Sequence, residues 1–314
     1  MNNSNKERID TISRDNLLFI ETIIRARKYF LNIDLFGNTL CVYDSSKETI
    51  TRTLCTFHSP FVSAVISDLL LSGNIFNKKH VIIRKNIDLL KAQCRPNGLF
   101  CFFGKHTDYP SDLDDTACAW IAILNYYPSH MSDVPIDTIF HNRNRAGDIL
   151  TWYNRPNHDV ADWVVLGNVL RLLHRCCVVD YKLNREFEKS ILEACKSKTG
   201  SPYYSDIVVA LAFSAPSIRD LFGRNSKCSD AVVRCMEEIS INSFDPRFAA
   251  YLYVLSVLGT PKKDDMEKLV YQQKPDGGWE SFPLFNHLSK EKCYDSRAVS
   301  TAFSVAAINS HFNV

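Results

Sequence analysis

A helical unit that occurs twice is the feature that most constrains the fold of this 314-residue chain. Residues 93–100 and 273–279 share a Gln, a Pro, an Asn or Asp, a Gly and a final aromatic residue. Each segment is followed, after a loop, by an apolar stretch rich in small residues, at 115–124 and at 300–308. Such a unit cannot bury its apolar face alone. The sequence therefore predicts units that stack into a closed ring or a solenoid.

Helical periodicity extends through most of the chain. Apolar residues recur with helical spacing at 17–24, 61–71 and 164–173, and Pro- and Asn-rich breaks separate such stretches. Alternating strand patterns are scarce, and residues 40–43 are the best candidate for a strand. Small residues on the second helix of the unit allow close helix approach, and its Gln can cap the turn. We expect an all-α toroid of helical hairpins, an α/α barrel, that forms one domain over 1–314, with 1–35 as part of it or as an N-terminal helical extension.

Composition and charge exclude several classes of protein. An apolar fraction of 46%, with 11 Gly and 12 Pro, is typical of a compact folded chain. The net charge of +2 and the lack of a dense Lys/Arg run argue against a nucleic-acid partner. The eleven cysteines have no CxxC spacing, and the polar N-terminus precedes no apolar signal core. We expect reduced thiols and a cytoplasmic protein.

Three aspartates stand together at the predicted start of a helix. Asp112, Asp114 and Asp115 lie within four residues, directly before the small apolar run that begins at Thr116. Because three such carboxyls cannot all ionise cheaply, repulsion raises the pKa of one, while hydrogen bonds and the helix N-terminus stabilise charge on the others. Helix capping is the alternative interpretation, but it accounts for only one or two of them. The pattern favours a buried acid.

These segments carry a resemblance to a known superfamily. Residues 112–117, DLDDTA, look like the DxDD motif of class II terpene cyclases, and residues 273–279 look like the QW motif of squalene–hopene and oxidosqualene cyclases. Residues 162–170 and 294–299 resemble small bacterial proteins with prenyltransferase and squalene-oxidase repeats. The resemblance implies the α/α barrel of terpenoid cyclases and protein prenyltransferases. It also implies protonation-initiated cyclisation of a linear isoprenoid, either a prenyl diphosphate or a squalene-type hydrocarbon.

The resemblance also implies roles for individual residues. Asp114 matches the proton donor of the family, and Asp112 and Asp115 match the flanking carboxylates, with Thr116 continuing their hydrogen-bond network. Carbocations need stabilisation without a nucleophile, and an aromatic face supplies about 2 kcal/mol or more when desolvated. Ordinary core packing is the alternative for each aromatic residue. The aromatic candidates for substrate contact are Phe102, Phe103, Tyr109, Trp120, Trp152, Tyr153 and Trp163, and the candidates for orienting the acid or accepting the last proton are His158, His174 and Asn168.

Cofactor and partner expectations follow from the same resemblance. Protonation needs no cofactor and no metal, whereas a diphosphate substrate would bring Mg²⁺ and basic residues near the cavity mouth. The nominal basic candidates are Lys91, Arg95, Lys105, Arg155 and Arg297. The cyclases compared usually pair this barrel with a second helical domain. Here the cavity lies inside one barrel, or a second copy or another protein closes it, or activity has been lost; peripheral membrane contact and a homo-oligomer also remain open.

Three other functions remain as alternatives. Class I ionisation requires a DDxxD metal cluster, but Cys118 stands at the position of its last Asp. A protein prenyltransferase β subunit requires a zinc site of Asp, Cys and His, but Asp295 is followed by Ser296 and Arg297. A noncatalytic toroid that binds an isoprenoid or a protein would tolerate substitution of Asp114 without loss of function.

Overall fold

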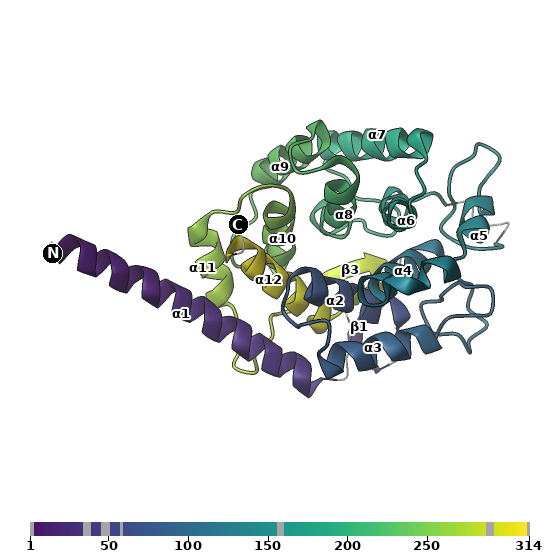
Figure 1. Cartoon of the computed structure of the whole chain (residues 1–314). Helices are drawn as coiled ribbons and strands as arrows, with labels where there is room; N and C mark the ends of the chain where they lie inside the picture. Colours follow the sequence, from purple (N-terminus) through teal and green to yellow (C-terminus); the bar gives the residue numbers. More distant parts are fainter. Residues whose placement is uncertain are drawn as a thin grey trace.

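The structure is a computed structural model that describes residues 3–33, 39–44, 51–56, 59–155, 160–286 and 292–312. Helices dominate it, and four short strands accompany them (Figure 1). In chain order the elements are α1 Asn3–Asn32, β1 Thr39–Asp44, β2 Thr51–Thr56, α2 Pro60–Ser72, α3 Val81–Ala92, α4 Leu113–Tyr126, η1 Pro128–Asp133, α5 Ile136–His141, α6 Trp163–Arg175, α7 Tyr181–Ser197, α8 Ile207–Phe222, α9 Lys227–Ile239, α10 Phe248–Leu258, α11 Lys263–Tyr271, β3 Pro283–Asn286, β4 Lys292–Asp295 and α12 Arg297–Phe312.

The even-numbered helices α2, α4, α6, α8, α10 and α12 form the inner ring. Each packs on the next, and α12 packs on α2, so that the ring closes. Helices α3, α7, α9 and α11 pack on the ring from outside, and α1 lies against α12 (Figure 1). This arrangement confirms the predicted α/α toroid.

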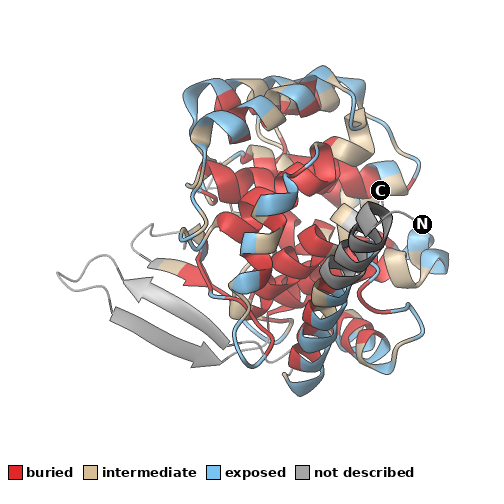
Figure 2. Ribbon diagram, turned by 90° about the vertical axis from the view of Figure 1, so that its left-hand side faces the viewer, coloured by how far each residue is buried: buried red, intermediate tan, exposed pale blue. Residues whose placement is uncertain are grey.

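Amphipathicity decides which helices are inner and which are outer. The sequence of α10, FAAYLYVLSVL, is apolar on all sides, and every one of its residues is buried. By contrast α9, KCSDAVVRCMEEI, buries only one face. A helix that is apolar all round needs neighbours on every side, whereas a helix with one apolar stripe covers a core from outside. The burial pattern in Figure 2 follows this rule, with buried inner helices and exposed outer faces.

The repeated unit is a structural joint between the two layers. The backbone N–H of Phe100 donates to Thr116 Oγ1 at 3.0 Å, and the N–H of Trp279 donates to Thr301 Oγ1 at the same distance. Each bond ties the aromatic residue after the glycine turn to the following inner helix. The repeat inferred from sequence is therefore confirmed as two equivalent joints, with Phe100 in the place that Trp279 fills in the second.

The Gln that occupies the same position in both units also has a structural role. Gln93 Oε1 accepts from the N–H of Lys105 at 3.1 Å, and Gln273 Nε2 donates to the carbonyls of Gly277 and Thr22 at 2.9 and 3.0 Å. Both side chains satisfy backbone groups that a turn leaves unpaired. Gln273 therefore caps its own turn as predicted and also contacts α1, whereas Gln93 bonds a residue beyond its own turn.

A small antiparallel sheet with strand order β2-β1-β4-β3 accompanies the helices. Strand β1 confirms the strand predicted at 40–43 and pairs with β4 in the register Val42↔Tyr294. Strands β2, β3 and β4 were not predicted, because strands of four to six residues carry too little alternation to be recognised. The β3–β4 pair brings Phe285 and Tyr294 to the cavity described below.

Helix α1 covers most of the predicted N-terminal segment. It has 30 residues, and its side chains Phe19, Ala26 and Phe30 are buried, whereas Leu17 and Ile20 are about half exposed at 55% and 54%. Among the described residues, no helix is both long and apolar enough to cross a membrane.

Candidate active site

Asp112 begins α4 and holds its first turn. Its Oδ1 accepts from the N–H of Asp115 at 2.7 Å, which satisfies one of the unpaired donors at the helix N-terminus. The backbone N–H of Leu113 donates to Thr151 O at 2.8 Å and the hydroxyl of Thr116 donates to Asp112 O at 2.6 Å, so the turn is fixed on both sides. Helix capping therefore accounts for Asp112 and not for the other two aspartates.

Asp114 lies in the first turn of α4 and receives three side-chain hydrogen bonds, one of them a long bond of 3.9 Å from Cys118 Sγ to its Oδ1. The phenol of Tyr204 donates to its Oδ2, and Asn168 Nδ2 donates to its Oδ1 at 2.8 Å. Asp114 is 7% exposed and lines a cavity at the end of the barrel where α4 begins. Because both oxygens already accept a hydrogen bond, the ionised form that remains after proton transfer is stabilised.

Burial and mutual repulsion keep protons in the cluster. Burial raises the pKa of Asp114 to about 7, assisted by the negative charge of Asp112 and opposed by the bonds from Tyr204 and Asn168. Burial likewise raises the pKa of Asp112 to about 6, against hydrogen bonds that lower it. The pKa of Asp115 is raised well above its ordinary value by burial, followed by the charge of Asp112. Burial is therefore the largest cause for all three carboxyls, whereas the sequence led us to expect that repulsion would raise the pKa of only one of them.

The three carboxyls differ in how they hold a proton. Asp115 shares a side-chain hydrogen bond with Asp112, and its Oδ2 is enclosed with no partner. A proton on Asp115 is therefore held tightly. All three carboxyls line the cavity, and the pKa of Asp114, at about 7, lies above that of Asp112 and is less strongly raised than that of Asp115.

Aromatic side chains form most of the cavity wall. The edge of Tyr109 meets Phe103 at a centroid distance of 4.7 Å and Trp152 at 5.5 Å, and Phe285 stacks on Tyr294 at 5.4 Å. Such faces stabilise a cation without offering it a nucleophile. The residues that line the cavity are Phe61, Phe102, Phe103, Tyr109, Asp112, Asp114, Asp115, Thr151, Trp152, Val165, Tyr203, Tyr204, Phe285 and Tyr294.

Four of the predicted aromatic residues lie in this wall, namely Phe102, Phe103, Tyr109 and Trp152. Asn168 contacts the acid itself. His174 is exposed in the last turn of α6 and is not among the residues that line the cavity. His158 lies outside the described residues.

Two predicted tryptophans are placed elsewhere. Trp120 lies almost two helical turns after Asp114, and its side chain is outside the cavity wall. Its Nε1 donates to Gly98 O at 2.8 Å. Trp163 is the first residue of α6 and is half-buried outside the cavity wall, whereas Val165, two residues later, lines the wall. We therefore correct the substrate-contact prediction for Trp120 and Trp163; Tyr153 also lies outside this wall.

Sequence reasoning missed the tyrosines before α8. Tyr203 accepts from Trp152 Nε1, and Tyr204 reaches Asp114 across 90 residues of sequence. Asp162 holds their loop, because its Oδ2 accepts from the hydroxyl of Ser201 at 2.7 Å and from the N–H of Tyr203 at 3.0 Å. A sequence signal for these residues did exist. A pair of tyrosines stands immediately before a helix that an Asp caps, and the segment before α4 has a similar arrangement. Phe61, Phe285 and Tyr294 were missed as well.

Most of the nominal basic candidates have other structural roles. Arg95 donates to the carbonyls of Thr107 and Tyr109, and Arg297 pairs with Asp276. Lys91 lies 4.9 Å from the centroid of the Tyr127 ring. Arg155, in contrast, lies 5.9 Å from the ring centroid of Trp152, a cavity residue. Within the described ranges, no group of three or more His, Cys, Asp or Glu side chains could hold a metal ion.

Comparison with known proteins gives matches in sequence and in fold. Residues 75–176 match the family described as the sesquiterpene cyclase astC-like C-terminal domain. Drimenol cyclase drtB of Aspergillus calidoustus is 26% identical over 211 residues, which cover 64% of this chain and 38% of that protein. The chain therefore spans well under half the length of this curated relative.

The fold match covers nearly the whole chain. The apo structure of the type II terpene cyclase MstE from Scytonema superposes with a TM-score of 0.66 at 15% identity, over 94% of this chain and 99% of that one. A variant of MstE in complex with its substrate, geranylgeranyl dihydroxybenzoate, gives a TM-score of 0.65 at 14% identity over 95% of this chain and 99% of that one. The astC-like match includes the aspartate cluster, and the fold is that of a type II cyclase. Part of the sequence is therefore similar to the astC-like sesquiterpene cyclase family, and the fold is similar to that of a type II terpene cyclase.

Proposed function

We propose that this protein is a class II terpene cyclase in which Asp114 starts the cyclisation of a linear isoprenoid by protonating a carbon–carbon double bond. One observation carries the proposal: a buried carboxyl with a pKa near 7 lies in an aromatic-lined cavity. Protonation of an alkene needs an acid that is still protonated when substrate arrives and a cavity without competing water.

The residues of the site have separate roles in the proposed reaction. Asp114 transfers its proton to a double bond of the substrate, which becomes a carbocation, and the next double bond attacks that cation to close a ring. The carboxylate left on Asp114 is stabilised by the donors of Tyr204 and Asn168 and by the N-terminus of α4. Phe285 and the other wall aromatics stabilise the moving positive charge. The final cation loses a proton to water at the cavity mouth, and this loss forms the last double bond.

An isoprenoid chain is the substrate class that this cavity supports, since its apolar wall can exclude water along a hydrocarbon chain. The complex of MstE with geranylgeranyl dihydroxybenzoate supports the same class. Protonation itself requires no cofactor. A diphosphate substrate would bring Mg²⁺ with it, and Arg155, beside the cavity residue Trp152, is the basic side chain that we propose for such a headgroup.

We further propose that the whole chain acts as one α/α domain, with the cavity mouth free for a second copy or another helical domain to cover. The nine described free cysteines suit the reducing cytoplasm, where we expect the protein to act. Binding of an isoprenoid without catalysis is the alternative, which the following experiment separates.

The test is product formation. Purified protein is incubated with farnesyl diphosphate, geranylgeranyl diphosphate or squalene, with and without Mg²⁺, and products are analysed by gas chromatography–mass spectrometry after phosphatase treatment. The expected result is a cyclic product that Asp114→Asn does not form, while the control Asp137→Asn, at an exposed residue of α5, forms it normally. Undiminished turnover by Asp114→Asn would remove the donor assignment, and no product from any substrate would favour the binding toroid.

A further inference from the structure

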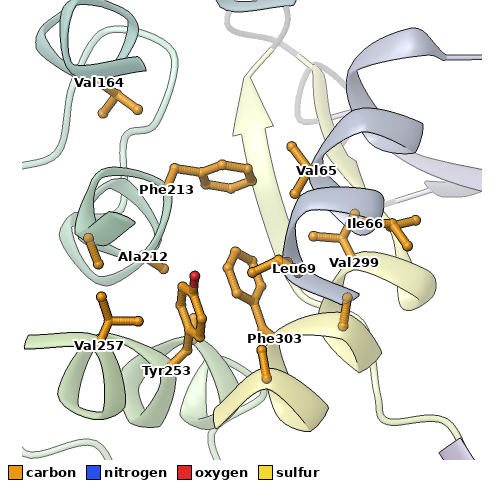
Figure 3. Close-up of a cluster of buried hydrophobic side chains, with 14 of the residues drawn as sticks. Val65, Ile66, Leu69, Val164, Ala212, Phe213, Tyr253, Val257, Val299 and Phe303 are labelled. Carbon is orange, nitrogen blue, oxygen red and sulfur yellow. The ribbon is translucent and has the colours of Figure 1, made fainter. Parts of the chain in front are cut away.

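A second cavity lies inside the barrel, deeper along its axis than the aspartate cluster. Figure 3 shows part of its apolar wall. There the hydroxyl of Tyr253 points into the space between Ala212, Phe213 and Phe303. Its volume of about 30 Å³ exceeds the ~10–15 Å³ that one water molecule requires. The cavity is therefore large enough for ordered water.

This cavity lies directly behind the acid. Cys118 Sγ is 3.9 Å from Asp114 Oδ1, and Asn168 Nδ2 is 2.8 Å from the same oxygen. Cys118 and Asn168 both line the second cavity, whereas Tyr204, which binds Oδ2, lines the first. The two oxygens of Asp114 thus contact residues of two different cavities, one on the substrate side and one on the inner side.

The second cavity also contains polar and charged groups, although its wall is mostly apolar. Asp68 and Arg171 line it, and they form a salt bridge of 2.7 Å. With Asn168 and the Tyr253 hydroxyl, they provide the two to four polar partners that a buried water needs. A cavity lined in this way is suited to water and not to a hydrocarbon chain.

The charged cluster continues to the far end of the barrel. Arg171 Nε also pairs with Asp220 at 2.9 Å, and Asp220 pairs with Arg175 at 3.5 Å. Exposure of these side chains increases along the series, from 5% for Arg171 to 19% for Asp220 and 32% for Arg175. Asp220 and Arg175 lie near the C-terminal ends of α8 and α6, opposite the helix end that carries the acid.

We propose that water in the second cavity returns a proton to Asp114 after each turnover, drawn from the far end of the barrel and not through the substrate cavity. The inference rests on the proposed function, because only a proton donor must be reloaded. Asp114 does not itself line the second cavity, so the transfer passes through Cys118. The Cys118 thiol gives its proton to Asp114 Oδ1 and takes one from a cavity water, which takes one from water at the charged end. One proton enters from bulk solvent for each proton delivered to substrate, and no electron or other group moves.

The physical reason for a second route is that the first cavity must stay dry. While an isoprenoid or its cyclic product occupies the aromatic cavity, bulk water cannot reach Asp114 from that side. Access through Cys118 and Asn168 allows reloading without admitting water to a carbocation.

The experiment fills the second cavity without touching the acid. Ala212 lines the cavity and is 1% exposed, so Ala212→Val places extra methyl groups inside it. Ala210→Val, on the same helix and also buried but outside the cavity wall, is the matched control for overpacking. Rapid-quench kinetics then compare the first turnover with the steady state, and thermal melts confirm that both variants fold.

We expect Ala212→Val to keep the first-turnover rate and to slow later turnovers by about tenfold or more, which produces a burst. Ala210→Val shows no burst. Equal loss of both rates in Ala212→Val, or no change in either, would overturn the resupply route while leaving the cyclase proposal intact. Absence of any cyclic product from the unmodified protein would instead overturn the cyclase proposal.

A second readout does not depend on turnover. A crystal structure at high resolution should show ordered water in the second cavity between Asp68 and Asn168, and none there in Ala212→Val. A dry cavity in the unmodified protein would overturn the route whatever the activity. Should Ala212→Val fail to fold, Ala64→Val fills the same cavity from α2 and serves the same test.

Discussion

At the scale of single residues, the central feature is a carboxyl whose acidity is set by its neighbours. Burial and the charge of Asp112 raise the pKa of Asp114 to about 7, and Tyr204 and Asn168 oppose the rise. The cluster itself could be predicted, because its three carboxyls are adjacent in sequence. Asn168, 54 residues away, was among the candidates for orienting the acid, whereas Tyr204 was not predicted, since it lies 90 residues away and no local sequence pattern indicates the contact.

The raised pKa predicts the pH dependence of both rate and stability. Asp114 must be protonated to act, so the cyclisation rate should fall as pH rises through about 7. Because the folded pKa exceeds the ordinary 3.8, the folded state binds more protons between about pH 4 and 7, and the free energy of unfolding should decrease across this window as pH rises. Urea unfolding at several pH values measures the slope, and Asp114→Asn should reduce it. An unchanged slope in that variant would contradict the raised pKa.

Tyr204→Phe tests the donor to Asp114 Oδ2. Without the phenol the carboxylate loses a hydrogen bond that lowers its pKa, so the acid becomes weaker and the high-pH limb of the rate profile moves upward. We expect kcat at pH 6 to fall about 10- to 100-fold. Tyr203→Phe, in the same wall but bonded to Trp152, is the control and should keep the pH profile. Identical profiles for Tyr204→Phe and the unmodified protein would show that the bond does not tune the acid.

At the scale of elements, each of the two repeated joints ties a glycine turn to the following inner helix. Only one of these two helices carries the acid. Thr116 belongs to the helix that carries the acid, whereas Thr301 belongs to α12, behind the β3–β4 pair. The repeat itself could be predicted from the sequence pattern alone. The two copies of the repeat do not themselves show which one lies beside the site. Only the position of the aspartates indicated this.

Substituting each threonine separates stability from activity. Thr116→Val and Thr301→Val each leave a backbone N–H without its partner, which should cost about 1–3 kcal/mol of unfolding free energy by denaturant titration. Thr116→Val should also lower kcat, because Thr116 bonds to Asp112 O and fixes the first turn of α4. Equal kcat losses in the two variants would mean that the joint acts on activity only through stability.

At the scale of the whole molecule, the closed ring is linked across its interior by a buried cation. Arg171 on α6 pairs with Asp68 on α2 and with Asp220 on α8. Arg171→Met leaves two carboxylates without their shared partner and should destabilise the fold by about 3–5 kcal/mol. Chemical denaturation measures this loss of unfolding free energy. The control is Lys189→Met, which removes an exposed ion pair and should change the unfolding free energy by less than about 1 kcal/mol. A loss of similar size in both variants would contradict the role of Arg171.

Helical periodicity and the repeat were sufficient to predict the toroid, because inner helices such as α10 are apolar on all sides and outer helices are not. The sheet was largely missed, and with it Phe285 and Tyr294, since short strands at a barrel end carry little pattern of their own. Trp120 was misplaced for a related reason: its position relative to the cavity depends on helix rotation that composition does not reveal.

The central claim is that a proton from the protein's acid enters the product. The most direct measurement runs the reaction in D₂O with the accepted isoprenoid and determines by mass spectrometry how much deuterium the cyclic product gains. Asp114 exchanges its proton with solvent, so we expect one deuterium at the carbon that is protonated first, and no product from Asp114→Asn. A cyclic product that carries no deuterium would contradict protonation as the initiating step.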